Sequence, residues 1–231
     1  MSRPLLFTVL SIVAVCSVFA ALLFGTYPIS VTRALDAIFH PTSGVVHDVI
    51  WQLRAPRAAA AFACGGLLAL AGALLQVLLR NALADPYILG VSSGASFGAL
   101  LALTVGAGAW LMNTAALAGA LAAIVIVFGL SFRGGDWNVY RLLLIGVVLA
   151  TGLSALVSLL LAMAPQAQVK GMLFWLMGDL AYAGSPAPAW MVLVVVALYG
   201  VARATELDLL GLGQFKAHSL GVSVTSLQDG V

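Results

Sequence analysis

Two arginines just ahead of a long apolar run could recognise a carboxylate. Arg54 and Arg57 stand in the stretch WQLRAPRAAAAF, at residues 51–62. Residues three apart share one face of a helix, so both guanidinium groups are expected to reach the same partner. Arginine binds carboxylates through paired hydrogen bonds, so an acidic group would be a suitable partner. The alternative is a pair of anchors whose side chains extend to the lipid headgroups.

A second polar stretch, RNALADPYILGVSSGAS at residues 80–96, lies between two apolar runs. Asp85 is expected to cap a short helix that starts at Pro86. Gly90 should interrupt this helix, and one of the two following serines should cap the next one. Interrupted backbone is tolerated at membrane depth only against protein or water, so this stretch could be part of a transport route. From these residues alone, turn chemistry favours an ordinary turn between two spans. The residues of this broken-helix turn are Asp85, Pro86, Gly90, Ser92 and Ser93.

A third stretch, LDLLGLGQFKAHSLGV at residues 207–222, mixes an apolar cluster with glycines. Leu207, Leu209, Leu210 and Leu212 form the cluster. Gly211 and Gly213 interrupt it, and residues 214–220 can form a second short helix. An exposed and partly apolar helix pair is typical of a docking element. A basic amphipathic stretch that lies on the membrane is the alternative.

The elements that position these residues must be membrane helices. The 231 residues are 63% hydrophobic and only 8% charged, whereas soluble domains average about 25% charged residues. No Asp, Glu, Lys or Arg occurs in residues 86–132 or 142–169. A span needs about 20 apolar residues, so the chain is an all-α, polytopic transmembrane bundle.

Six spans are expected, together with a short helix on the outer side within residues 171–184. Their approximate ranges are 5–25, 58–79, 92–107, 114–130, 142–164 and 188–202. Lys and Arg are commoner in cytoplasmic loops, and this rule places the N-terminus in the cytoplasm. Residues 1–205 then form the transmembrane domain, and residues 206–231 form a cytoplasmic loop.

Several kinds of chemistry are not indicated. The sequence has no GxxxxGK[ST] motif for nucleotide phosphates, and its net charge of +2 contains no basic run that suggests nucleic acid. Cys16 and Cys64 lie in apolar segments without CxxC spacing, so neither a metal site nor a cofactor is expected. Apart from Asp179 in the outer segment, no Asp, Glu, His or Lys lies deep in an expected span, unlike in ion-coupled carriers. The chain is expected to be a non-enzymatic framework, and if it transports, the energy must come from elsewhere.

The three polar stretches together resemble the FecCD family of permeases. These belong to ATP-driven bacterial importers for iron–siderophores, haem and vitamin B12. The segments GGLLALAGALLQ, LLLIGVVLATGLSALVSLL and FWLMGDL fit as well, so the resemblance covers about residues 51–224. Family members continue with further spans after the cytoplasmic loop, whereas this sequence stops at Val231.

The resemblance implies a role for each stretch. Arg54 and Arg57 would receive acidic residues of a soluble substrate-binding protein on the outer side. Asn81 and Leu83 would help to close the cytoplasmic end of the translocation path, with a second contribution from around residues 138–140. The loop would couple to an ATP-binding subunit through Leu207, Leu210, Gly211, Gly213, Ala217, Leu220 and Gly221.

The expected protein is a permease subunit of the bacterial inner membrane. It would form the translocation path with a second copy or with a homologue. A channel or secondary carrier independent of ATP is one alternative, and a truncated remnant that does not transport is another. No residue in the sequence indicates whether the cargo is an iron–siderophore, haem or cobalamin.

Overall fold

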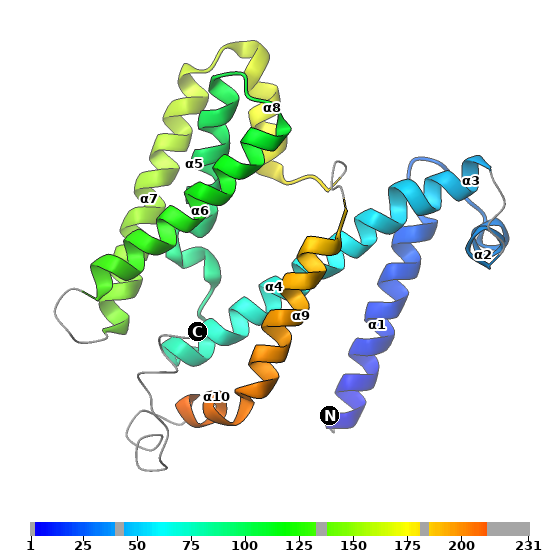
Figure 1. The fold of residues 1–231 in the computed structure, drawn as a ribbon, viewed down its shortest axis with the longest axis horizontal. Coiled ribbons are helices and arrows are strands. Elements are labelled where there is room, and N and C mark those ends of the chain that lie inside the picture. Colours follow the sequence, from blue (N-terminus) through cyan, green and yellow to red (C-terminus); the bar gives the residue numbers. More distant parts are fainter. Residues whose placement is uncertain (1–2, 40–43, 133–137, 181–184, 212–231) are drawn as a thin grey trace. The chain divides into compact units, whose positions relative to one another are not determined.

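The computed structural model describes residues 3–39, 44–132, 138–180 and 185–211. All regular elements in these ranges are helices (Figure 1). The chain divides into two compact units, residues 1–67 with 179–199 and residues 68–178 with 200–231. The long helix α4, Ala55–Leu79, contributes to both units.

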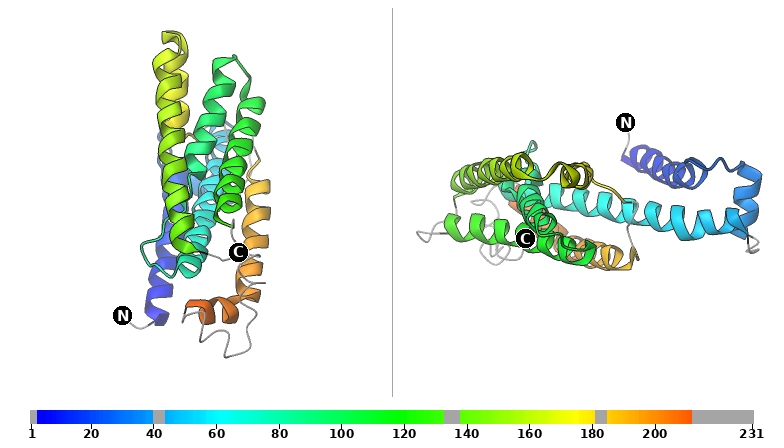
Figure 2. Two further views of the ribbon diagram at one scale, coloured as in Figure 1. Left: turned by 90° about the vertical axis from the view of Figure 1, so that its left-hand side faces the viewer. Right: turned by 90° about the horizontal axis from the view of Figure 1, so that it is seen from above.

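The first unit begins with α1 (Arg3–Leu23) and the short helix α2 (Val31–Phe39). A continuous helical stretch follows, in which α3 (Val45–Asp48) leads through the π-helical turn η1 (Val49–Arg54) into α4. In Figure 1, α1 runs within the plane of the view, whereas α2 is seen nearly along its axis. The view from above in Figure 2 agrees, so α2 runs across the direction of α1.

Helix α9 (Ala187–Ala202) packs on the first part of α4. The Trp190 indole nitrogen donates a 3.1 Å hydrogen bond to the Ala59 carbonyl oxygen. Its ring stacks on that of Phe62, with 5.7 Å between the ring centroids. Gly66 lies against the Leu193 side chain, where a Cβ atom would come within 3.0 Å of a methyl carbon. A small residue at this position therefore allows the two helices to approach closely.

The second unit contains helices that pack around α5, Val91–Thr104 (Figure 1). They are α6 (Ala109–Ser131), α7 (Val139–Met163) and α8 (Gln166–Met177). A 3₁₀ turn, η2 (Pro86–Leu89), precedes α5, and α10 (Ala204–Gly211) is the last element described.

Glycines set the contact between α5 and α6. A Cβ atom on Gly94 would lie 2.9 Å from the Ala123 Cβ atom and even closer to the Gly119 carbonyl oxygen. A Cβ atom on Gly119 would in turn meet the Gly94 carbonyl oxygen. The two backbones therefore touch, as small residues permit in membrane helix pairs. Packing of this kind replaces the hydrophobic driving force, which is absent between helices in lipid.

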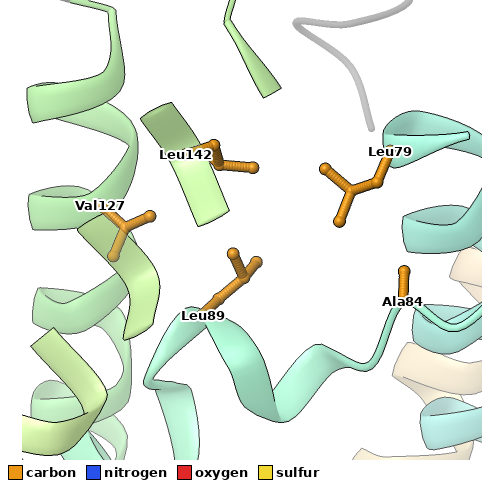
Figure 3. Close-up of a cluster of buried hydrophobic side chains, with 5 residues drawn as sticks. All are labelled: Leu79, Ala84, Leu89, Val127 and Leu142. Atoms are coloured by element: carbon orange, nitrogen blue, oxygen red, sulfur yellow. The ribbon is translucent and has the colours of Figure 1, made fainter. Parts of the chain in front are cut away.

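One buried hydrophobic cluster of this unit lies where α4 ends and α5 begins. It consists of the buried side chains Leu79, Ala84, Leu89, Val127 and Leu142 (Figure 3). Chain segments from the end of α4, the following turn, α6 and α7 all contribute to it. The interrupted segment after α4 therefore contacts other helices through Ala84 and Leu89, whereas Leu83 and Tyr87 are exposed.

Each expected span corresponds to a helix. Four helical stretches in the described residues are long and apolar enough to cross a membrane: Pro4–Leu23, Val45–Leu79, Ala109–Ser131 and Val139–Met163. The apolar helices α5 and α9 have only 14 and 16 residues, fewer than the about 20 of a full span. The helical membrane fold is confirmed, and the number of six spans stays a prediction.

The expected outer segment at residues 171–184 begins earlier than predicted. Helix α8 starts at Gln166, directly after Pro165, and ends at Met177. Gly178 then adopts a φ of 78°, a conformation that favours glycine and ends the helix. Residues 181–184 lie outside the part of the chain that the structure describes.

Candidate functional site

The interrupted turn after α4 begins with Asn81. Its backbone nitrogen donates to the Gln76 carbonyl oxygen at 3.1 Å, which closes the end of α4. Its side-chain oxygen accepts a 2.9 Å hydrogen bond from the Leu83 nitrogen. The preceding residue, Arg80, has a φ of 49°, which is uncommon for a residue other than glycine. Leu83 follows with an 86% exposed side chain.

The helix restarts as the sequence predicts at Asp85 and Pro86. Asp85 is the N-cap of η2, and its carboxylate accepts a 2.9 Å hydrogen bond from the Tyr87 nitrogen. Gly90 ends this turn with a φ of 75°. A Cβ atom on Gly90 would lie 3.3 Å from the Ala150 backbone nitrogen of α7. Both the conformation and the close approach of α7 favour glycine at this position.

The expected capping role of Ser92 and Ser93 is wrong. Helix α5 already begins at Val91 with Gly90 as its N-cap, and no side chain caps it. Both serines lie within the first turn of the helix, after the N-cap position. Ser93 has a different partner, because its hydroxyl oxygen lies 3.1 Å from that of Ser154 on α7. Hydroxyl pairs of this kind join neighbouring membrane helices.

Asn81 and the start of α7 line one hollow with a volume of about 620 Å³. Asn138 is the N-cap of α7, and its side-chain oxygen accepts hydrogen bonds from the nitrogens of Tyr140 and Arg141 at 2.9 and 3.2 Å. The residues that line the hollow are Leu78, Leu79, Arg80, Asn81, Asn138, Val139, Tyr140 and Leu143. Segments that are about sixty positions apart in the sequence thus meet at one polar site.

Around residues 138–140 the family resemblance was too loose to assign single residues. The structure shows that Asn138 and Tyr140 line the hollow. An asparagine directly before a long apolar run is a helix-start signal, which could have identified Asn138. Leu83 does not line the hollow. It lies two positions after Asn81, and its backbone nitrogen donates a hydrogen bond to the Asn81 side-chain oxygen.

In the first unit, Arg54 and Arg57 have different environments. Arg54 is only 9% exposed, and its guanidinium donates to the carbonyl oxygens of Leu22 and Leu23 at 2.8 Å. It also donates to the Tyr27 carbonyl oxygen. The side chain thus satisfies carbonyl groups at the end of α1 that have no partner within the helix. Arg57 is exposed.

The expectation that both guanidinium groups face one partner is therefore not met here. The partners of Arg54 are two carbonyl groups at the end of α1 and one at Tyr27, beyond it, and none of them could be recognised from the sequence around Arg54. Gly25 accommodates this arrangement, because a Cβ atom there would lie 2.8 Å from the guanidinium. Only Arg57 has the exposure that an external partner requires.

The candidate coupling residues are described only in part. Helix α10 ends at Gly211 and contains Leu207, whose side chain is buried. Near its start, Arg203 and Glu206 form an ion pair with a 2.6 Å separation. Leu210 lies in the helix, but its side chain is outside the description. Gly213, Ala217, Leu220 and Gly221 lie beyond the described residues.

The apolar helices and the polar, interrupted turn among them define a polytopic helical membrane protein. The sequence profile of the FecCD transport family matches residues 12–229. The chain therefore belongs to the FecCD transport family.

Two curated relatives are vitamin B12 import system permease proteins BtuC. The protein from Citrobacter koseri is 34% identical over 178 residues, which are 75% of this chain and 53% of the relative. That from Escherichia coli O1:K1 is 34% identical over 179 residues, 75% of this chain and 54% of the relative. The chain thus spans about half the length of these relatives.

A solved structure shares the fold. It is described as an inward-facing conformation of a metal-chelate type ABC transporter. It has a TM-score of 0.80 and 31% sequence identity, and the match covers 98% of this chain and 70% of that one.

Proposed function

We propose that this chain is part of a permease subunit in an ATP-driven importer for iron–siderophore chelates, haem or cobalamin. The main support is the family match over residues 12–229, because it includes the segments around the polar hollow. The BtuC relatives are named for vitamin B12 import, and the structural relative is described as a transporter of the metal-chelate type. ATP hydrolysis would belong to a separate subunit.

The translocation path would run between this permease and a second copy or a homologue. Asn81 and Leu83 would help to close its cytoplasmic end, together with the start of α7. The shared hollow supports this assignment, because a shift of either segment changes the surroundings of Asn81. An 86% exposed leucine beside a polar turn is suited to obstruct a water-filled path.

The coupling site would begin in α10 and continue beyond the described residues. Residues 206–231 would contact the ATP-binding subunit through Leu207, Leu210, Gly211, Gly213, Ala217, Leu220 and Gly221, and residues 1–205 would form the transmembrane domain. With the N-terminus in the cytoplasm, Arg57 would face the opposite side of the inner membrane. There it would receive an acidic residue of the substrate-binding protein, and Arg54 would support the docking surface from within.

The test is transport by the complete permease purified from its native membrane with its partner subunits. Vesicles containing this complex should take up cobalamin, a ferric siderophore or haem only when ATP reaches the ATP-binding subunit. The control is the same complex with a non-hydrolysable ATP analogue. Equal uptake without hydrolysis would contradict the proposal and favour a channel or secondary carrier. A purified chain without an ATP-binding subunit would contradict it as well.

A further inference from the structure

Helix α2 has three distinct faces. Ala34 and Ala37 are buried against Ile50 of η1. The apolar residues Val31, Leu35 and Phe39 recur at every fourth position and are exposed, with Phe39 at 73%. Successive residues turn by about 100°, so these three fall within a sector of about 80°. This sector is separate from the one that contacts Ile50.

The third face of α2 is charged. Arg33 and Asp36 lie about 60° apart around the helix, on the side away from Val31. The helix is therefore attached to the protein along one face, apolar along the second and charged along the third. A helix with opposed apolar and charged faces is typical of a position in the membrane interface.

The depth of α2 follows from its contacts. The apolar stretch Pro4–Leu23 of α1 has 20 residues, a length of about 30 Å that matches the hydrocarbon core of a bilayer. Arg54 bonds to carbonyl groups at the end of this stretch and marks the boundary of the core. Ile50 and Trp51, which α2 contacts, precede Arg54 by about one helical turn. Helix α2 therefore lies at the level of the headgroups.

The direction of α2 fits this depth. It runs across α1 in both views, so it lies along the membrane surface when α1 crosses the membrane (Figures 1 and 2). The Trp51 indole nitrogen donates a 3.2 Å hydrogen bond to the Ala37 carbonyl oxygen. This bond joins the end of α2 to a residue type that is enriched at membrane interfaces.

We propose that α2 is a lipid-binding helix of the membrane interface, with Val31, Leu35 and Phe39 inserted among the upper parts of the acyl chains. Arg33 and Asp36 face the headgroups and water. The helix holds η1, and with it Arg54, at a constant depth in the membrane. We favour lipid over a protein partner because of where the exposed apolar face lies. Helix α2 runs along the membrane surface, beside the ends of two stretches that can cross the membrane, Pro4–Leu23 and Val45–Leu79.

The test places a fluorescent label at single cysteines in the complete permease, with Cys16 and Cys64 replaced by alanine. Leu35→Cys reports on the apolar face, and Arg33→Cys is the matched control on the charged face. The protein is reconstituted in vesicles of phosphatidylethanolamine and phosphatidylglycerol. A fraction of the lipid carries a nitroxide near the carboxyl end of its acyl chain, which quenches nearby fluorophores.

We expect the label at position 35 to show a blue shift and a loss of emission, whereas the label at position 33 stays unquenched. Equal, water-like emission from both labels would overturn the proposal. So would a label at position 35 that becomes shielded only when the substrate-binding protein is added, because α2 would then be a protein-docking surface. Unchanged circular dichroism of both variants shows that the fold is retained.

Discussion

The Arg54 guanidinium donates a 2.8 Å hydrogen bond to the carbonyl oxygen of Leu22, which lies 32 positions earlier in the chain. The bond ties the turn η1 to the end of α1. It uses a charged donor that is almost completely buried, and such a donor is costly to leave without partners. Arg54 is thus a structural residue in this arrangement, and its replacement should lower the free energy of unfolding.

Arg54→Lys should lower the free energy of unfolding by about 2 kcal/mol, because an ammonium group cannot reproduce the planar fork that reaches several carbonyl groups. Unfolding in detergent micelles measures the effect. Arg57→Lys is the matched control, and its effect should stay within about 0.5 kcal/mol because the side chain is exposed. Equal losses in both variants would contradict the structural role of Arg54.

Arg57→Glu should reduce the stimulation of ATP hydrolysis by the substrate-binding protein at least about tenfold, since reversal of a charge at an interface costs several kcal/mol. Basal hydrolysis and thermal stability should not change. The rate of hydrolysis is measured with and without the binding protein. Arg33→Glu is the control, because Arg33 is also exposed but belongs to α2. Undiminished stimulation by the Arg57 variant would exclude it from the docking site.

Gly119→Ala should destabilise the protein by about 1–3 kcal/mol, because the new Cβ atom meets the Gly94 carbonyl oxygen within a packed helix pair. Gly129→Ala in the same helix is the control. Nothing lies within 4 Å of the Cβ position at Gly129, so alanine should be neutral or stabilise by up to about 1 kcal/mol. Unfolding of both variants under identical conditions measures the difference. The backbone contact between α5 and α6 would be refuted by a Gly119→Ala variant as stable as the control.

Gly90→Ala should cost about 1–2 kcal/mol for the left-handed backbone alone, with a further loss because Ala150 is close. Gly106→Ala separates the two effects. Gly106 ends α5 with a φ of 70° and the hydrogen bonds of a left-handed C-terminal residue, but nothing lies within 4 Å of its Cβ position. The difference in unfolding free energy between the two variants therefore measures the contact with α7. A larger loss for Gly106→Ala would contradict close packing around Gly90.

Leu83→Ala should increase leakage of small polar solutes through the reconstituted permease severalfold, because the truncated side chain no longer obstructs the path. Stability should change by less than about 0.5 kcal/mol, since the side chain is exposed. Efflux of a trapped fluorophore from vesicles measures the leak. Val105→Ala is the control, as Val105 is 79% exposed beyond the other end of α5. A leak that is the same in both variants would remove Leu83 from the proposed gate.

The helices and the restart at Asp85 could be predicted from short segments of the sequence. The length and hydropathy of an apolar segment, and the residues that cap a helix, depend only on neighbouring positions. The partners of Arg54 and Ser93 could not be predicted in the same way. Arg54 bonds to carbonyl groups about thirty positions away, and Ser93 meets a hydroxyl on α7. Asn138 is intermediate, since its cap is local but its place beside Asn81 depends on the packing of α7.

The π-helical turn at Val49–Arg54 has a consequence for how this helix can vary. A π turn closes i→i+5 hydrogen bonds and accommodates one more residue than an α-helical turn. Deletion of one residue there can restore α-helical geometry while the residues upstream keep their orientation relative to α4. Deletion of one residue from the regular part of α4 would instead rotate everything upstream by about 100°, and Ile50 would turn away from Ala34 and Ala37. The turn is thus the place where the length of this helix can change by one residue while the contact with α2 is kept.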